Sequence, residues 1–437
     1  MRHSAFLAVP LVAGAVLFGA AHGRADRGVS PAAPGPETPT SPAAHAAAST
    51  APAGAPVREE ARAVWVNRWE YRTAADVARI MEKAAWANLN VVYFQVRGPS
   101  DAYYRSEIDP CSVRLCGRLG GTPAWDPLEV AVREAHARGI QLHAWINALS
   151  GWDSQEGDFC RLLKPSDPGR PNHVLVDHPE WAMHTRAGKP QACPNGQEYV
   201  YLSPGNPGVR THLARVAADV VRRYAVDGVH LDRIRYPGAS YGWDRASLAA
   251  FGRDPARDPA GWARFRREMV SRTVRETHDS IRSVRPVPLS AAVWPIYDRE
   301  RFGWSSSSGV GQFFQDTWEW ARGGYLEVAV PMTYFRVNDE YCSYAARQGG
   351  RARNPDWTCM LDDHLRGMAP SGRDVYVAIS AGLPQAEIEK QIRIGRERGV
   401  KGFAFYSFGA LDRRGAWSRL GEGAFREPAS VPRTRTE

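Results

Sequence analysis

The chain alternates between short apolar runs and stretches in which apolar residues recur at helical spacing. Eight apolar runs are predicted to form strands, and they cover residues 63–66, 91–94, 140–146, 226–232, 288–293, 328–332, 375–379 and 402–406. A helical pattern follows the runs; after the first of them, Val77, Ile80, Met81 and Ala84 share one face of a helix that begins near Thr73. Continuous apolar strands that alternate with helices are typical of a parallel sheet covered by helices.

Eight strand–helix units most simply close into a (β/α)8 TIM barrel with long βα loops. An open doubly wound sheet is the alternative fold. No glycine-rich phosphate loop follows the first strand, which argues against a dinucleotide site. The segment 147–204 is predicted to be one very long loop at the end of the third strand.

The residues outside the barrel divide into three segments. Residues 1–23 place Arg2 and His3 before an apolar run, which predicts a secretory signal peptide; an uncleaved membrane anchor is the alternative. Residues 24–57 are rich in Ala and Pro and are predicted to be a disordered linker, as is a tail at 427–437. The barrel domain is therefore expected at 58–426. We expect a secreted or cell-envelope-associated protein with no integral membrane segment after signal removal, and we leave its oligomeric state open.

Charge and cysteine content narrow the classes of partner. The 437 residues carry a net charge of +9, but the arginines are scattered, which disfavours nucleic acid and fits anionic cell-envelope polymers better. Six cysteines in an exported protein favour disulfides, and proximity suggests the pairs Cys111–Cys116, Cys160–Cys193 and Cys342–Cys359. Zinc is the alternative, but no close CxxC pair supports it, and we expect neither metal nor cofactor.

Polar and aromatic residues follow the predicted strands, where a barrel enzyme carries its catalytic groups. The candidate catalytic carboxyls are Asp232, Asp101 and Glu70. The candidate substrate-binding residues are Arg97, His143, Trp145, Asn147, His230, Arg235, Trp294 and Tyr334.

Each candidate also has a purely structural interpretation. Asp232 ends the fourth strand and is the favoured catalytic carboxylate; its structural alternative is an ion pair with Arg233 or Arg235. Asp101 could cap its loop, and Glu70 could cap the first helix. The histidines and tryptophans could simply fill the barrel.

The set as a whole favours carbohydrate chemistry. Aromatic rings suit the apolar faces of sugars, whereas amides, arginines and carboxylates suit their hydroxyl groups. Glycoside hydrolysis needs one acid and a second group that stabilises or attacks the cationic sugar centre. No Ser–His–Asp order is evident. We expect a glycoside hydrolase; the rivals are a non-catalytic glycan-binding barrel and a metal-dependent deacetylase.

Several segments resemble the glycosyl-hydrolase-like family 10 barrels. They are RAVWV at 62–66, FQVR at 94–97, DAYY at 101–104, WDPL at 125–128, EAHARG at 134–139, LHAWIN at 142–147, YLSPG at 201–205 and DGVHLD at 227–232. The resemblance implies a TIM barrel acting on β-linked amino-sugar polymers, with peptidoglycan glycan strands as the leading substrate. It gives Asp232 the position of a catalytic carboxylate and does not identify the second acid.

Overall fold

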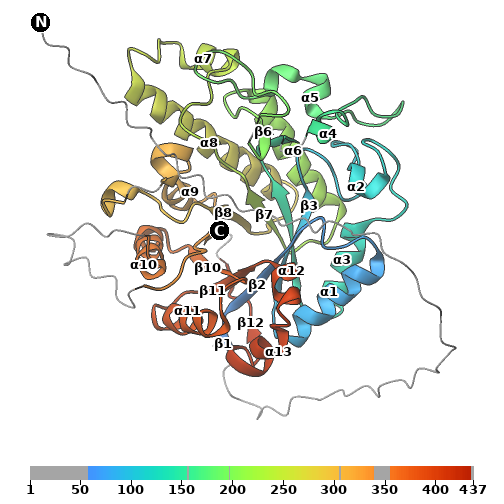
Figure 1. Cartoon of the computed structure of the whole chain (residues 1–437), viewed down its shortest axis with the longest axis vertical. Helices are drawn as coiled ribbons and strands as arrows, with labels where there is room; N and C mark the ends of the chain where they lie inside the picture. Colours follow the sequence, from blue (N-terminus) through green and yellow to red (C-terminus); the bar gives the residue numbers. More distant parts are fainter. Residues whose placement is uncertain (1–57, 155–156, 196, 305–306, 339–354, 435–437) are drawn as a thin grey trace, which may run out of the picture. The chain divides into compact units, whose positions relative to one another are not determined.

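Eight parallel strands form a closed barrel in the computed structural model (Figure 1), which describes residues 58–154, 157–195, 197–304, 307–338 and 355–434. The strands follow one another around the barrel in the order β10, β11, β2, β3, β4, β7, β8, β9. Their bounds are Ala61–Val66 (β2), Val91–Arg97 (β3), Gln141–Asn147 (β4), Gly228–Asp232 (β7), Leu289–Val293 (β8), Val328–Pro331 (β9), Asp374–Ser380 (β10) and Gly402–Tyr406 (β11). All eight predicted strands are present.

The last strand closes the barrel against the first. β11 pairs with β2, with Gly402 opposite Ala61, and β9 pairs with β10, with Val328 opposite Asp374. This closure confirms the TIM barrel and rules out the open sheet. The predicted signal peptide and linker lie outside the described residues.

Helices surround the strands in Figure 1. The longer ones are α1 (Ala74–Trp86), α3 (Pro127–His136), α6 (Pro207–Arg223), α8 (Pro259–Arg282), α10 (Trp357–Met368) and α11 (Gln385–Glu397); shorter ones are α2 (Val113–Cys116), α4 (Gly157–Cys160), α5 (Val174–Asp177), α7 (Arg245–Phe251), α9 (Thr317–Arg322), α12 (Phe408–Arg413) and α13 (Trp417–Arg419). Thr73 and Asp76 form a capping box that starts α1, and the Asp126 carboxylate caps α3. The predicted helix periodicity therefore corresponds to real helices with defined starts.

Large side chains fill the interior of the barrel. Trp65, Tyr93, Trp145 and Tyr376 pack there, each 3% exposed or less. Gly228 leaves room for this filling, because a Cβ at that position would lie 2.4 Å from Nδ1 of His143. The interior is thus a packed core, and chemistry is left to the ends of the strands.

The segment predicted as one long loop contains structure of its own. β5 (Ser150–Asp153) and β6 (Tyr199–Tyr201) form a two-stranded antiparallel sheet within it. The disulfide Cys160–Cys193 joins two parts of this segment, and Cys111–Cys116 closes the loop after β3, which confirms two predicted pairs. The third pair involves Cys342, which lies outside the described residues.

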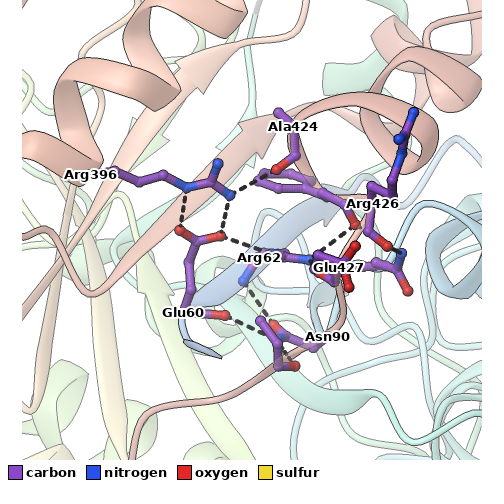
Figure 2. Close-up of polar contacts among 10 residues, drawn as sticks. Glu60, Arg62, Asn90, Arg396, Ala424, Arg426 and Glu427 are labelled. Carbon is purple, nitrogen blue, oxygen red and sulfur yellow. Dashed lines mark hydrogen bonds and ion pairs between the residues drawn. The ribbon is translucent and has the colours of Figure 1, made fainter. Parts of the chain in front are cut away.

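The C-terminal segment of the chain packs against the amino ends of the strands (Figure 2). We call this region the barrel floor; it consists of Glu60, Arg62, Asn90, Arg396 and the backbone of residues 424–429. Arg62 Nη1 donates to the Glu427 carbonyl at 2.8 Å, and Arg396 donates to the Glu60 carboxylate at 2.7 Å. β12 (Ala429–Ser430) pairs with β1 (Arg58–Glu59). Residues 427–430, predicted as part of a disordered tail, are thus bound here, because buried floor groups need their carbonyls as partners.

Candidate functional site

Asp232 ends β7 at the carboxyl ends of the strands, which we call the barrel mouth. Its side chain is 13% exposed, and its Oδ1 accepts the backbone N–H of Arg233 at 2.6 Å. Asp232 pairs in register with Asn147, the last residue of β4. The predicted carboxylate and the predicted amide therefore end neighbouring strands at the same level.

Arg233 holds a second carboxylate near Asp232. Its φ of 54° lies in the left-handed region, which is uncommon for a residue other than glycine and concentrates at functional sites. Its guanidinium contacts Glu198 at 2.6 Å and lies over the ring of Tyr199. Glu198 was not among the predicted site residues, because it lies in the long segment after β4, where no periodic pattern marks the end of a strand.

Arg235 lies close to the Asp232 carboxylate. The side chain is buried, and its Nη1 lies 3.8 Å from Asp232 Oδ1 without a hydrogen-bond partner. Burial and the neighbouring Arg233 lower the pKa of Arg235. The half-buried Trp294 ring lies under the guanidinium at 5.3 Å. Tyr334 packs 5.6 Å from Tyr406 at the same mouth.

A chain of amides links the exits of β2, β3 and β4. Arg68 donates its backbone N–H to Gln95 Oε1 at 3.1 Å, and Gln95 Nε2 donates to Asn147 Oδ1 at 3.2 Å. These side chains are buried. Asn147 is therefore held in one orientation beside Asp232.

Arg97 lies behind the mouth rather than in it. Its Nε contacts Asp109 at 2.6 Å, and its Nη1 donates to the Asn147 carbonyl at 2.5 Å. His212 contacts the other oxygen of Asp109 at 2.7 Å. Arg97 is 1% exposed, so its geometry suits positioning of Asn147 better than contact with a substrate.

Asp101 is a buried carboxyl with an unused oxygen. Its Oδ1 has no hydrogen-bond partner, and it lies where a Cβ on Gly98 would come within 2.7 Å. Burial raises the pKa of Asp101 to about 6, against the opposing charge of Arg68. A carboxyl with such a pKa is protonated in mildly acidic solution and can act as an acid.

Glu70 joins the exits of β2 and β11. Its Oε1 accepts hydrogen bonds from the side chains of Asn67 and Ser407 and from the backbone of Gly409, and its Oε2 accepts the backbone N–H of Asn67. Burial raises the pKa of Glu70, and these hydrogen bonds oppose that rise. Since both oxygens are engaged, the geometry of Glu70 suits a brace between two strands.

His143, Trp145 and His230 lie in the packed interior below the mouth. His230 Nε2 accepts from Trp65 Nε1 at 3.0 Å and its Nδ1 contacts Ser290 at 2.8 Å. Burial lowers the pKa of His143 to about 4 and that of His230 well below its usual value. Neutral imidazoles at this depth support the barrel-filling interpretation.

Other features of the described ranges bear on the kind of site that the mouth forms. No group of three or more His, Cys, Asp or Glu side chains is arranged there to hold a metal ion. None of the helices described is both long and apolar enough to span a bilayer. A hollow of about 340 Å³ lies among Tyr104, Arg105, Cys111, Arg170 and Arg223, and none of the predicted site residues lines it.

Comparison with known families agrees with this architecture. The model of the glycosyl hydrolase-like 10 family matches residues 60–354. The chain belongs to this family. Glycosyl hydrolase DigH from Escherichia coli K12 is 29% identical over 263 residues, covering 59% of this chain and 57% of that protein. Glycosyl hydrolase YngK from Bacillus subtilis 168 is 25% identical over 307 residues, covering 65% and 56%. The chain thus spans a little over half the length of these relatives.

Solved structures share the fold of this family member at low sequence identity. The PgaB (BpsB) glycoside hydrolase domain from Bordetella bronchiseptica aligns with a TM-score of 0.56 at 12% identity, over 83% of this chain and 99% of that one. The β-amylase catalytic domain from Paenibacillus polymyxa aligns with a TM-score of 0.54 at 10% identity, over 82% and 94%. These similarities concern the barrel itself.

Proposed function

We propose that this protein is an exported glycoside hydrolase that cleaves β-linked amino-sugar glycans, with peptidoglycan glycan strands as the leading substrate. Asp232 carries the proposal, because a partly exposed carboxylate ends a barrel strand beside arginine, amide and tyrosine groups in a member of a glycosyl-hydrolase-like family. Two disulfides support export to an oxidising compartment.

Asp232 is proposed as the acid or nucleophile, and Asp101 is the better-supported partner of the two remaining candidates. Asp101 has an oxygen without a partner and a raised pKa, as a general acid requires. Glu70 has every oxygen engaged, so a positioning role suits it better. Asn147, Arg235 and Tyr334 remain the proposed sugar-binding groups.

The test is turnover of purified glycan strands, followed as new reducing ends. Asp232→Asn keeps the side-chain shape and removes the charge, so we expect turnover to fall about 10²–10⁴-fold. Glycan affinity should stay within roughly tenfold, since the amide still accepts hydrogen bonds. Unchanged turnover in Asp232→Asn would discard the assignment of this residue.

A non-catalytic glycan-binding barrel is the second candidate. Glu70 is engaged in hydrogen bonds and Asp101 is buried. Neither predicted partner therefore offers Asp232 an exposed second carboxyl, which favours a binding role. Tight binding of glycan strands by the wild-type protein, with no new reducing ends over long incubation, would select this alternative.

A further inference from the structure

Trp69 is a large apolar side chain left exposed at the barrel mouth. Its ring is 47% exposed and lies two residues beyond Asn67, the first residue after β2. The two tryptophans predicted to contact sugar, Trp145 and Trp294, are buried and half-buried instead. The exposed aromatic surface at the mouth is therefore provided by other strand-end rings than these two tryptophans.

The Trp69 ring is supported from beneath. Arg68, which is buried, places its guanidinium 4.9 Å from the ring centroid. The turn that carries Trp69 is closed by a backbone hydrogen bond from Glu70 to Asn67 at 2.9 Å. An exposed ring fixed in this way loses little conformational freedom when a ligand covers its free face.

Tyr406 offers a second exposed ring on the neighbouring strand. It ends β11, is 36% exposed, and its hydroxyl donates to Asn67 Oδ1 at 3.3 Å. The Glu70 brace connects the turn of Trp69 to Ser407, the next residue after Tyr406. The turn that carries Trp69 and the end of β11 are thus linked through Asn67 and Glu70.

This pair of rings lies across the mouth from Asp232. Three strands separate β11 from β7 in each direction around the barrel. The Tyr406 ring also packs 5.6 Å from the ring of Tyr334, which follows β9. A ligand that crossed the mouth from β11 to β7 would reach both the rings and the carboxylate.

We propose that Trp69 and Tyr406 form a sugar-stacking platform that holds a pyranose ring of the glycan opposite Asp232. The inference rests on the proposed function for its ligand class, a β-linked amino-sugar chain. The apolar C–H face of the sugar covers Trp69, while the hydroxyl and acetamido groups at the ring edge face the polar groups of the mouth. The platform positions the chain and takes no part in proton transfer.

The test is binding of the β-1,4-linked hexamer of N-acetylglucosamine to the full chain carrying Asp232→Asn, measured by calorimetry. We expect Trp69→Ala to weaken affinity about tenfold and Trp69→Phe to weaken it less, because the smaller ring keeps part of the stacking surface. Trp86→Ala is the matched control: Trp86 is 52% exposed but ends α1 near the barrel floor, so its removal should leave affinity unchanged.

A spectroscopic reading separates stacking from general destabilisation. Ligand binding should change the tryptophan fluorescence of the Asp232→Asn protein, and Trp69→Phe should abolish most of that change while binding persists. Equal affinity in Trp69→Ala and the control would overturn the platform even if the wild type cleaves glycan. Affinity that depends on Trp69, without any turnover, would support the platform and overturn the hydrolase. A wild type that neither binds nor cleaves would overturn both.

Discussion

At the barrel floor, Arg62 donates hydrogen bonds to Glu60 and to the carbonyls of Phe425 and Glu427, whereas at the mouth the equally buried Arg235 leaves Nη1 without a hydrogen-bond partner. Charges at the floor are also paired. Burial acts to raise the pKa of Glu60, but Arg396 and Arg62 hold that pKa below its usual value. Incomplete pairing at the mouth costs stability but leaves groups available to a ligand, so the comparison separates a region built for folding from one built for binding.

The largest expected effect tests the floor. Arg62→Met should lower the free energy of unfolding by about 3–5 kcal/mol, because it leaves buried floor groups without their donor. Urea denaturation measures this change. The control is Arg257→Met, which breaks an exposed i,i+3 pair with Asp254 and should cost less than about 0.5 kcal/mol. Equal losses in the two variants would contradict the distinction drawn for the floor.

A smaller, pH-dependent effect tests the mouth. The pKa of Asp101 in the folded protein, about 6, lies above its ordinary value of 3.8. The folded state therefore binds the proton more tightly, and the stability that this proton contributes is present below pH 3.8 and lost as pH rises through 6. Asp101→Asn has no such carboxyl to ionise, so its free energy of unfolding should rise relative to that of the wild type by up to about 3 kcal/mol between pH 4 and pH 7.

Chemical denaturation at several pH values measures that gain. Turnover in the same range supplies a second reading, because the proposed acid works only while protonated. Wild-type and Asp101→Asn stability curves that run parallel across the range would show that the carboxyl titrates normally. Asp101 would then lose the support for its role as an acid.

The strands were predictable because a strand covered on one face and packed inside a barrel on the other must be apolar throughout. The β7 region illustrates the limit of that reasoning. The predicted strand began at Val226 because the apolar run begins there. Val226 is indeed buried, but β7 begins two residues later, at Gly228. The identity and order of the elements were recovered, and their ends were approximate.

The site was predictable only where position along a strand sets depth in the barrel. His143, Trp145 and Asn147 share one face of β4, and the pattern could not reveal that the last of them alone reaches the mouth. Arg97 forms an ion pair with Asp109. Asp109 lies in a loop without a periodic pattern, so this pairing could not be predicted. Glu198 was not predicted for the same reason, since it lies in the long segment between β4 and α6.

The smallest expected change in stability concerns Arg235. Arg235→Met removes a buried cation whose Nη1 has no hydrogen-bond partner, while Asp232 keeps the backbone N–H of Arg233. The free energy of unfolding should therefore change by less than about 1 kcal/mol, or rise, in contrast to the same substitution at Arg62. Urea denaturation of both variants under one set of conditions makes the comparison direct.

Glycan affinity should depend on Arg235 and not on Arg62, the reverse of the order expected for stability. Because hydrogen bonds to a charged group contribute about 1.5–3 kcal/mol, loss of the available Arg235 donor should weaken affinity at least tenfold. Arg62→Met should leave the affinity of the folded fraction unchanged, since the floor lies at the other end of the strands. If Arg235→Met proved as destabilising as Arg62→Met and bound glycan normally, Arg235 would be a structural partner of Asp232, and the mouth would resemble the floor.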